Sequence, residues 1–196
     1  MLATGNAGKA REMARALDDL PLRLLTLRDV PRVSLPPEGE TSYADNAVAK
    51  ARAVAAVTGW WALADDSGLE VDALGGGPGV VSARYGGSGL DDAGRWRTLL
   101  GAMAAVPAAS RTARFRSVIA LRAGSREATV DGVVEGVILT EARGAGGFGY
   151  DPVFYYAPLE ATFAELSDEA KNAVSHRGVA LVRARQVLRR WLGLPA

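Results

Sequence analysis

Apolar residues recur at helical spacing in some stretches of the chain and alternate with polar residues in others. Residues 2–4 are predicted to end a short strand, and residues 5–8 to form a turn. The following segment predicts a helix with one apolar face, formed by Met13, Ala16, Leu17 and Leu20. Residues 31–39, with two consecutive prolines, predict an extended connection.

A second helix and a second strand follow. Ser42-Tyr43-Ala44-Asp45 resembles a capping box, so an alanine-rich helix is expected to begin there and to stop near Gly59. Residues 60–64 predict a short apolar strand that runs directly into an acidic motif. The glycine-rich run 75–79 is expected to be a loop.

The middle of the chain predicts a helix and a β-hairpin. Residues 91–103 indicate a helix whose inner face carries Trp96, Leu99, Leu100 and Met103. Alternating positions indicate a strand with Phe115, Ser117, Ile119 and Leu121 on one face. Residues 127–139 return as a second strand, which places the turn at Gly124-Ser125.

The last third predicts a glycine-rich loop over 144–149, a short strand over 153–156 and a short helix over 168–174. A longer helix after Ser175 is expected to bury Ala180, Ala184, Val187, Leu188 and Trp191. Helices and strands alternate early and a hairpin lies in the middle. The fold class is therefore predicted as α/β, a mixed sheet flanked by helices, in one domain spanning residues 1–196.

The composition narrows the class of protein. The 196 residues are 48% hydrophobic, which is typical of a globular protein, and no apolar run is long enough to span a bilayer. Without cysteine, disulfides and thiolate zinc sites are excluded, and the first residues lack a secretory signal. A net charge of +1 gives no electrostatic case for binding a nucleic acid polymer. We expect a cytoplasmic protein with neither a membrane nor a nucleic acid polymer as partner.

The basic residues are mostly arginines. Of the 23, only Lys9, Lys50 and Lys171 are lysines, and His176 is the only histidine. Where such a chain keeps a lysine, the site is a candidate for a compact, flexible point charge.

The first motif, Thr4-Gly5-Asn6-Ala7-Gly8-Lys9, lies between a predicted strand and a predicted helix. Unpaired backbone N–H groups and the helix dipole favour anions there, glycines let a phosphate approach, and Lys9 adds mobile positive charge. The spacing is not that of a Walker A loop. The alternative is an ordinary turn with an exposed lysine.

The second motif is Asp65-Asp66-Ser67-Gly68 at the end of an apolar strand. Adjacent carboxylates there suit a hard cation, and successive strand residues point to opposite faces, so the two have different roles. The alternative is an acidic turn.

The third motif is Gly146-Gly147-Phe148-Gly149-Tyr150-Asp151-Pro152. Glycines around two aromatic residues fit a sharply bent backbone that presents a ring for stacking on a base. A hairpin or bulge with both rings in the core is equally compatible with these residues.

The fourth motif is Lys171 followed by Ser175-His176-Arg177, with Ser175 as a candidate N-cap. A cation in the first helical turn works against the helix dipole, which indicates a ligand with acceptor groups. The alternative is a surface histidine on an arginine-rich helix.

In this order the four motifs resemble the inosine triphosphate pyrophosphatase family, also called the Ham1-like or XTP/dITP diphosphatase family. Matching stretches also include Glu38 with Asn46-Ala47 and residues 78–85. The resemblance covers essentially the whole chain. It implies an elongated fold with a nucleotide cleft between two lobes, a Mg2+ requirement, a homodimer, and hydrolysis of ITP, dITP or XTP to a monophosphate and pyrophosphate.

The resemblance also implies roles for individual residues. Asp66 is the expected general base and a metal ligand together with Glu38, although Glu40 is close enough to take that place. Substrate contacts are implied for Thr4, Gly5, Asn6, Ala7, Gly8, Lys9, Ser67, Phe148, Gly149, Tyr150, Asp151, Lys171, His176 and Arg177.

Two other functions remain as alternatives. A Maf-like pyrophosphatase shares the reaction but prefers pyrimidine or modified nucleotides, and the third and fourth motifs argue against it. A nucleotide-sensing module without turnover needs Lys9 and a base pocket but not Glu38 together with both aspartates.

Overall fold

The computed structural model describes residues 1–30 and 33–195. Pro31 and Arg32, where the predicted extended connection begins, lie outside the described residues; residues 33–39 carry no helix or strand. Contacts divide the chain into two compact units. Unit 1 comprises residues 1–66, 117–132 and 176–196, and unit 2 comprises residues 67–116 and 133–175.

Five strands form one sheet in chain order: β1 (Ala62–Val71), β2 (Thr112–Ala123), β3 (Arg126–Ile138), β4 (Phe154–Tyr156) and β5 (Ala161–Thr162). The pairs β3–β4 and β4–β5 are antiparallel. Leu2 forms a parallel bridge to Leu63, so the predicted mixed sheet is confirmed. The predicted hairpin turn joins β2 to β3, and Gly124 has a φ of 60° there.

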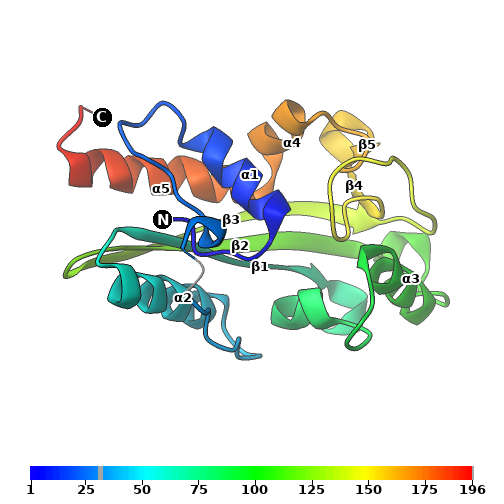
Figure 1. Cartoon of the computed structure of the whole chain (residues 1–196). Coiled ribbons are helices and arrows are strands. Elements are labelled where there is room, and N and C mark those ends of the chain that lie inside the picture. Colours follow the sequence, from blue (N-terminus) through cyan, green and yellow to red (C-terminus); the bar gives the residue numbers. More distant parts are fainter. Residues whose placement is uncertain (31–32, 196) are drawn as a thin grey trace. The chain divides into compact units, whose positions relative to one another are not determined.

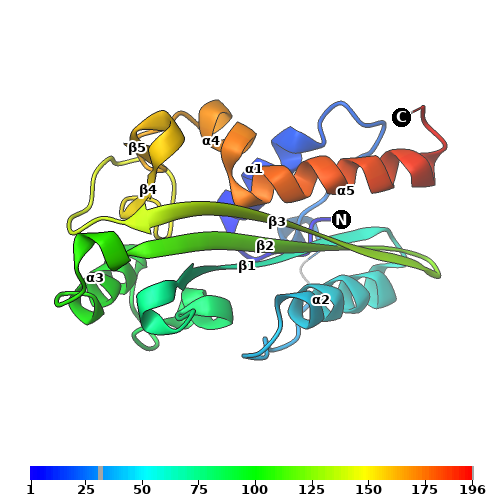
Figure 2. The same cartoon turned by 180° about the vertical axis from the view of Figure 1, so that it is seen from behind.

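Unit 1 contains three helices, α1 (Ala7–Ala16), α2 (Tyr43–Thr58) and α5 (His176–Leu192). Within this unit α1 and α5 lie on one face of the sheet and α2 on the other (Figures 1 and 2). The α1 and α5 side buries a core that includes Met13, Leu17, Ile119, Leu121, Ala184 and Leu188. The α2 side buries mainly small residues, among them Ala47, Ala51 and Val54.

Unit 2 contains α3 (Asp92–Ala102) and α4 (Asp168–Val174). Its core joins Leu69, Leu99 and Met103 to an aromatic cluster of Phe115, Phe154 and Phe163. Short 3-10 turns complete the chain: η1 (Leu27–Asp29), η2 (Asp72–Leu74), η3 (Gly79–Arg84), η4 (Ala108–Ser110) and η5 (Ala157–Leu159). No helix in the described part of the chain is long and apolar enough to cross a membrane.

Local signals in the sequence account for several boundaries. The Ser42 side chain accepts a hydrogen bond from Asp45 N–H and begins α2, and Gly59, with a φ of 71°, ends it. The predicted helices over 168–174 and after Ser175 are confirmed as α4 and α5.

The inner face predicted for α3 is confirmed, because Leu99 and Met103 are buried and the half-buried Trp96 and Leu100 pack against the same core. Two smaller predictions need correction. The turn predicted over residues 5–8 is shorter, because Asn6 caps α1 and the helix already includes Ala7 and Gly8. Gly79 belongs to η3 and not to the predicted loop.

The largest correction concerns the acidic motif. Strand β1 does not end before Asp65 but continues to Val71, so both aspartates lie inside the strand. A strand tolerates buried carboxylates only where other groups pair with them, and here such groups are present.

Candidate active site

The two adjacent aspartates of β1 are both buried, with Asp65 1% and Asp66 4% exposed. Because alternate strand residues point to opposite faces, the two carboxylates have separate partners. Asp65 contacts α1, α5 and β2, whereas Asp66 contacts α2. The acidic-turn alternative is wrong, because both aspartates lie inside β1, and the predicted difference between them appears in the structure as a difference in partners.

Asp65 is surrounded by cations and a hydroxyl group. Lys9 Nζ lies 2.6 Å from Oδ2, Arg177 Nε lies 3.4 Å from Oδ1, and Ser117 Oγ donates to Oδ1 at 2.5 Å. Burial by itself raises the pKa of this carboxyl, but the Arg177 and Lys9 charges outweigh burial and hold the pKa well below its ordinary range. Asp65 is therefore a permanent anion.

Lys9 is not the mobile cation that the sequence suggested. Its ammonium is held by Asp65, and its side chain is 17% exposed. Burial lowers the pKa of Lys9, and Asp65 opposes that shift only in part.

Asp66 has a different electrostatic environment. Lys50 Nζ donates to its Oδ1 at 2.9 Å and Asn46 Nδ2 to its Oδ2 at 3.0 Å. Burial raises the pKa of Asp66 above 3.8, and the opposing effects of Lys50, Asn46 and the more distant Lys9 do not reverse the shift. The neighbouring carboxyl groups thus shift in opposite directions, a pattern typical of functional sites.

Lys50 joins Asp66 to Glu38. Its ammonium also donates to Glu38 Oε1 and to the Asp65 carbonyl oxygen, each at 2.8 Å. Burial lowers the pKa of Lys50, but the two carboxylates outweigh burial and raise it. Sharing Lys50 favours Glu38 over Glu40 as the partner of Asp66.

Two carboxylates from different segments therefore meet at the Lys50 ammonium, and their oxygens are of the kind that a hard cation such as magnesium takes as ligands. Magnesium is commonly bound by one or two carboxylates plus substrate phosphates and water. The described residues contain no group of three or more His, Cys, Asp or Glu that can hold a metal ion by themselves. The donor set fits a cation that arrives with a phosphate ligand.

The loop before α1 has the chemistry of an anion site. Asn6 Oδ1 accepts from Lys9 N–H at 3.0 Å, and Asn6 N–H donates to Thr4 Oγ1 at 3.2 Å. Gly5 and Ala7 are exposed, so a phosphate can approach the backbone at the start of α1, although Gly8 is buried and Lys9 N–H already donates to Asn6.

His176 and Arg177 begin α5, and both are at least 96% buried. The surface-histidine alternative is therefore wrong. Arg177 Nη1 lies 2.5 Å from Glu12 Oε2, and its Nε faces Asp65. These ion pairs make the Arg177 guanidinium part of the carboxylate network of unit 1.

Unit 2 holds the third motif and Lys171. Asp151 Oδ2 accepts from Phe148 N–H at 2.8 Å and lies 2.6 Å from Lys171 Nζ. The same ammonium lies 4.4 Å from the centroid of the Phe148 ring. At Gly147, whose φ is 70°, a Cβ would lie 2.2 Å from Asp151 Oδ2, so only glycine fits this bend.

The two aromatic rings of this motif have different environments. Tyr150 is 5% exposed, packs in the core of unit 2 and donates its hydroxyl hydrogen to the Ser82 carbonyl oxygen at 2.8 Å. Burial raises the pKa of the Tyr150 phenol. Phe148 is half-buried. Tyr150 is thus a core residue, as one of the two alternatives predicted. Phe148 is the ring of this motif that remains a candidate for stacking on a base.

A model of the Ham1 family matches residues 1–187. The chain belongs to the Ham1 family. It is 49% identical over 191 residues to a dITP/XTP pyrophosphatase of Desulforamulus reducens, covering 97% of this chain and 95% of the relative. It is also 49% identical to one from Geobacter sulfurreducens, over 99% of this chain and 98% of the relative.

Solved structures agree with this assignment. A Ham1 protein from Coxiella burnetii has a TM-score of 0.84 and 42% identity, covering 96% of this chain and 97% of the other. The Staphylococcus aureus Ham1 protein has the same TM-score at 33% identity, with 96% of each chain covered. The predicted Ham1 fold class is thereby confirmed.

Four residues of this network had no specific role predicted from the sequence: Glu12, Asn46, Lys50 and Ser117. The sequence did carry a signal for Lys50, because lysine is rare in this chain. In the structure each of the three lysines pairs with a carboxylate. Glu12 and Ser117 lie in ordinary helix and strand patterns and carry no signal in the sequence.

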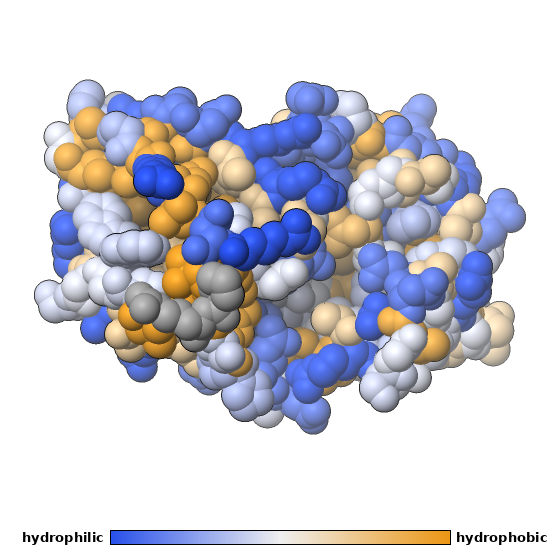
Figure 3. Space-filling model, viewed as in Figure 1, coloured by the Kyte–Doolittle hydropathy of each residue, from blue (hydrophilic) through white to orange (hydrophobic). Residues whose placement is uncertain are grey.

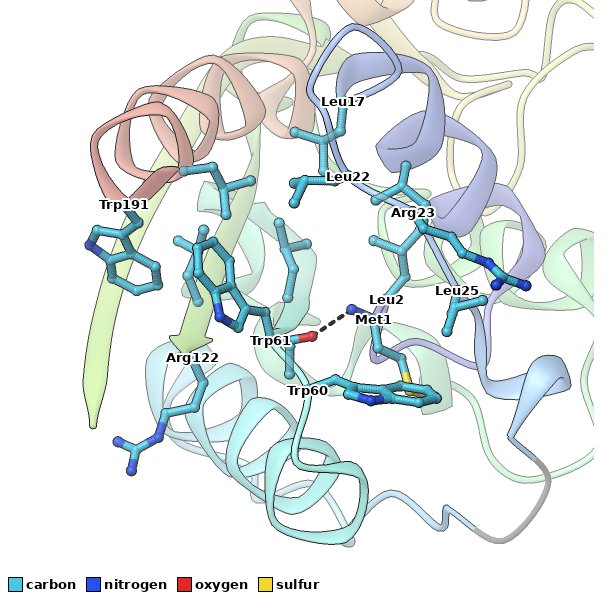
Figure 4. A pocket seen from close by; sticks show the side chains of 15 residues that line it. Met1, Leu2, Leu17, Leu22, Arg23, Leu25, Trp60, Trp61, Arg122 and Trp191 are labelled. Carbon is cyan, nitrogen blue, oxygen red and sulfur yellow. Dashed lines mark hydrogen bonds between the residues drawn. The ribbon is translucent and has the colours of Figure 1, made fainter. Parts of the chain in front are cut away.

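Unit 1 of this Ham1 protein also contains an apolar hollow of about 140 Å³, whose lining shares no residue with the acidic network (Figure 4). Its lining includes Leu17, Leu22, Trp60, Trp61 and Trp191. The Met1 amine donates to the Trp61 carbonyl oxygen at 2.5 Å. Apolar residues gather on this side of unit 1 in Figure 3. The lining contains no carboxylate, so it lacks the chemistry for a metal–triphosphate.

Proposed function

We propose that this protein hydrolyses the non-canonical purine nucleoside triphosphates dITP, ITP and XTP to monophosphates and pyrophosphate. Such a reaction removes these nucleotides before they enter DNA and RNA. The names of relatives at 49% identity over nearly their whole lengths support this substrate class. The observation that carries the proposal is the buried aspartate pair of β1, with opposite pKa shifts and cations on each side.

The chemistry of the proposed reaction needs three things from the chain. The triphosphate charge must be neutralised, water must be positioned, and the pyrophosphate must be stabilised as it leaves. Lys9 and the amide groups at the start of α1 are assigned to the phosphates, together with Thr4, Gly5, Asn6 and Gly8. Glu38 and Asp66 would hold Mg2+, which when bound supplies charge neutralisation and polarises phosphate oxygens.

Asp66 is proposed as the general base. Lys50 and Asn46 donate to its two oxygens and so fix the orientation of the carboxylate for taking a proton. Asp65 is unsuited to this role, because the Arg177 and Lys9 charges hold its pKa too low for it to take a proton. We assign Asp65 to fixing Lys9 and Arg177.

The base and the sugar are assigned to Ser67, the Phe148–Asp151 loop, Lys171 and His176. The half-buried Phe148 ring, with Lys171 above it, is proposed as the stacking platform. Lys171 offers only hydrogen-bond donors, which suit the 6-keto acceptor of hypoxanthine and xanthine but not the 6-amino donor of adenine. A site built on such pairing rejects the mismatched base strongly.

We further propose that the active form is a homodimer and that it acts in the cytoplasm, where the nucleotide pool is used. The homodimer rests on family resemblance. The absence of a membrane-crossing helix among the described residues is consistent with the location.

The decisive experiment is a substrate panel with product analysis. ITP, dITP, XTP, ATP and UTP are incubated with Mg2+ and with EDTA, and pyrophosphate and phosphate are measured separately. We expect pyrophosphate from the first three only, and none with EDTA. Preference for UTP would favour the Maf-like alternative. Tight ITP binding without any product would favour the sensing module.

A further inference from the structure

Phe148 sits between two peptide groups that are each held by a carboxylate. Its own N–H donates to Asp151 Oδ2 at 2.8 Å, and the next N–H, that of Gly149, donates to Asp92 Oδ2 at 2.7 Å. Asp151 belongs to the motif itself, but Asp92 is the first residue of α3, 57 positions away in the sequence. All of these residues belong to unit 2.

Asp92 is not needed to cap its own helix. The neighbouring Asp91 is the N-cap of α3, and its Oδ1 accepts from Gly94 N–H at 2.7 Å. Asp92 Oδ1 lies 3.3 Å from Arg95 Nη1, one turn further along α3. Arg95 thus orients the carboxylate through one oxygen while the other oxygen reaches the Phe148 loop.

The other contacts of the Phe148 loop show why the hydrogen bond from Gly149 to Asp92 matters. Tyr150 is anchored in the core through Ser82, and Asp151 is fixed by Lys171. Gly147 and Gly149 both have positive φ angles, of 70° and 64°. Glycines in this region gain much conformational freedom when a restraint is lost. Without Asp92, the peptide that follows Phe148 has no carboxylate to fix its direction.

We propose that Asp92 is a positioning residue that sets the orientation of the Phe148 ring for the base of the substrate. The link runs from Arg95 through Asp92 to the Gly149 peptide. This inference rests on the proposed function in one respect, that Phe148 stacks on the base. The geometric part of the inference, the restraint of the loop by α3, stands without it.

The test compares three variants. Asp92→Ala removes the acceptor, Asp92→Asn keeps an acceptor oxygen without the charge, and Asp91→Ala is the matched control that weakens the cap of α3 but leaves the loop contact. Amide hydrogen exchange of the peptide containing Gly149 is measured without any ligand. We expect exchange at Gly149 to be about fivefold faster in Asp92→Ala, from the loss of one hydrogen bond. It should be unchanged in Asp91→Ala.

Kinetics then test the link to the substrate. For ITP we expect KM to rise about fivefold in Asp92→Ala while kcat stays within about twofold, because the phosphates are held elsewhere. In Asp92→Asn, which keeps an acceptor oxygen, KM should stay close to the wild-type value. Inhibition by tripolyphosphate, which has no base, should be the same in all variants.

The restraint of the loop by Asp92 and its role in positioning the base can be overturned separately. Unchanged exchange at Gly149 in Asp92→Ala overturns the restraint. Faster exchange with an unchanged KM, or an equal KM increase in Asp91→Ala, overturns the role in base positioning. If the wild type does not hydrolyse ITP, the proposed function and the substrate part fail, while the exchange result still decides the geometric part.

Discussion

At the scale of single residues, counter-charges decide what the two neighbouring aspartates do. Both are buried, which favours the protonated acid in each case. Asp65 has two cations and a hydroxyl group around it, whereas Asp66 shares the single ammonium of Lys50 with Glu38. One carboxyl group becomes a permanent anion and the other remains a proton acceptor.

The first prediction follows for Asp66. Asp66→Asn keeps the shape of the side chain and the contact with Asn46 but removes the base and one proposed metal ligand. We expect the rate of ITP hydrolysis to fall about 100- to 10,000-fold, the usual cost of losing a general base. Circular dichroism should show a folded variant. A folded variant that keeps a third of the wild-type rate would show that Asp66 is not the base.

The second prediction concerns Asp65 and pH. Its native pKa lies below the ordinary 3.8, so the ionised group stabilises the fold above pH 3.8, and this contribution is lost as the pH falls below that value. At pH 7, Asp65→Asn leaves Lys9 and Arg177 without their shared anion, and we expect a loss of about 3–5 kcal/mol in the free energy of unfolding.

Urea unfolding of the wild type and Asp65→Asn from pH 7 to pH 3 checks this prediction. The difference between them should be constant down to about pH 4. Below that it should shrink by about 1.4 kcal/mol per pH unit. A difference that does not change with pH would mean that Asp65 has an ordinary pKa in the folded protein.

At the scale of elements, a close backbone approach determines how the first turn of α5 packs against β3. A Cβ at Gly132 of β3 would lie 2.1 Å from the His176 carbonyl oxygen and 2.6 Å from Ala180 N. Backbone atoms in an element cannot shift as the end of a side chain can. The glycine therefore allows the first turn of α5, which carries His176 and Arg177, to lie against the strand.

The third prediction tests this approach. Gly132→Ala should displace the start of α5, lower the free energy of unfolding by about 1–3 kcal/mol and reduce ITP hydrolysis together with it. The matched control is Gly101→Ala in α3, where a Cβ meets nothing within 4 Å. That change should stabilise the protein by about 0.4–1 kcal/mol. Equal stability of the two variants would argue against a tight contact at Gly132.

At the scale of the whole molecule, neither unit is a continuous piece of chain. Unit 1 is built from three segments and unit 2 from two, and the boundaries at residues 66/67, 116/117 and 132/133 fall inside β1, β2 and β3. Neither unit is therefore available as a simple truncation. Experiments on either unit therefore need the full chain.

The fourth prediction concerns the assembly. We expect a homodimer, so light scattering at micromolar concentration should give a mass of twice the 20.5 kDa of one chain. Dilution into the nanomolar range, followed by activity at constant ITP, tests whether assembly supports turnover. A mass near 20.5 kDa at all concentrations would contradict the dimer.

Features that depend on near neighbours could be predicted without the structure. Ser42 and Gly59 set the ends of α2, and Gly124-Ser125 sets the hairpin, because caps and turns involve residues only a few positions apart. The order of the motifs was enough to identify the family. The resemblance to that family also indicated which residues within the motifs are candidates for the active site.

Which charges meet depends on the fold and could not be predicted from the motifs. Arg177 is 112 positions from Asp65, and Lys50 reaches Glu38 and Asp66 from the middle of an alanine-rich helix whose pattern shows no site. The fold also separated Tyr150, which is packed in a core, from Phe148, which is half-buried. Burial and counter-charge set the pKa of a carboxyl group, and both are properties of surroundings assembled from distant segments. For that reason Asp65 and Asp66, adjacent and chemically identical in the sequence, became distinct only in the fold.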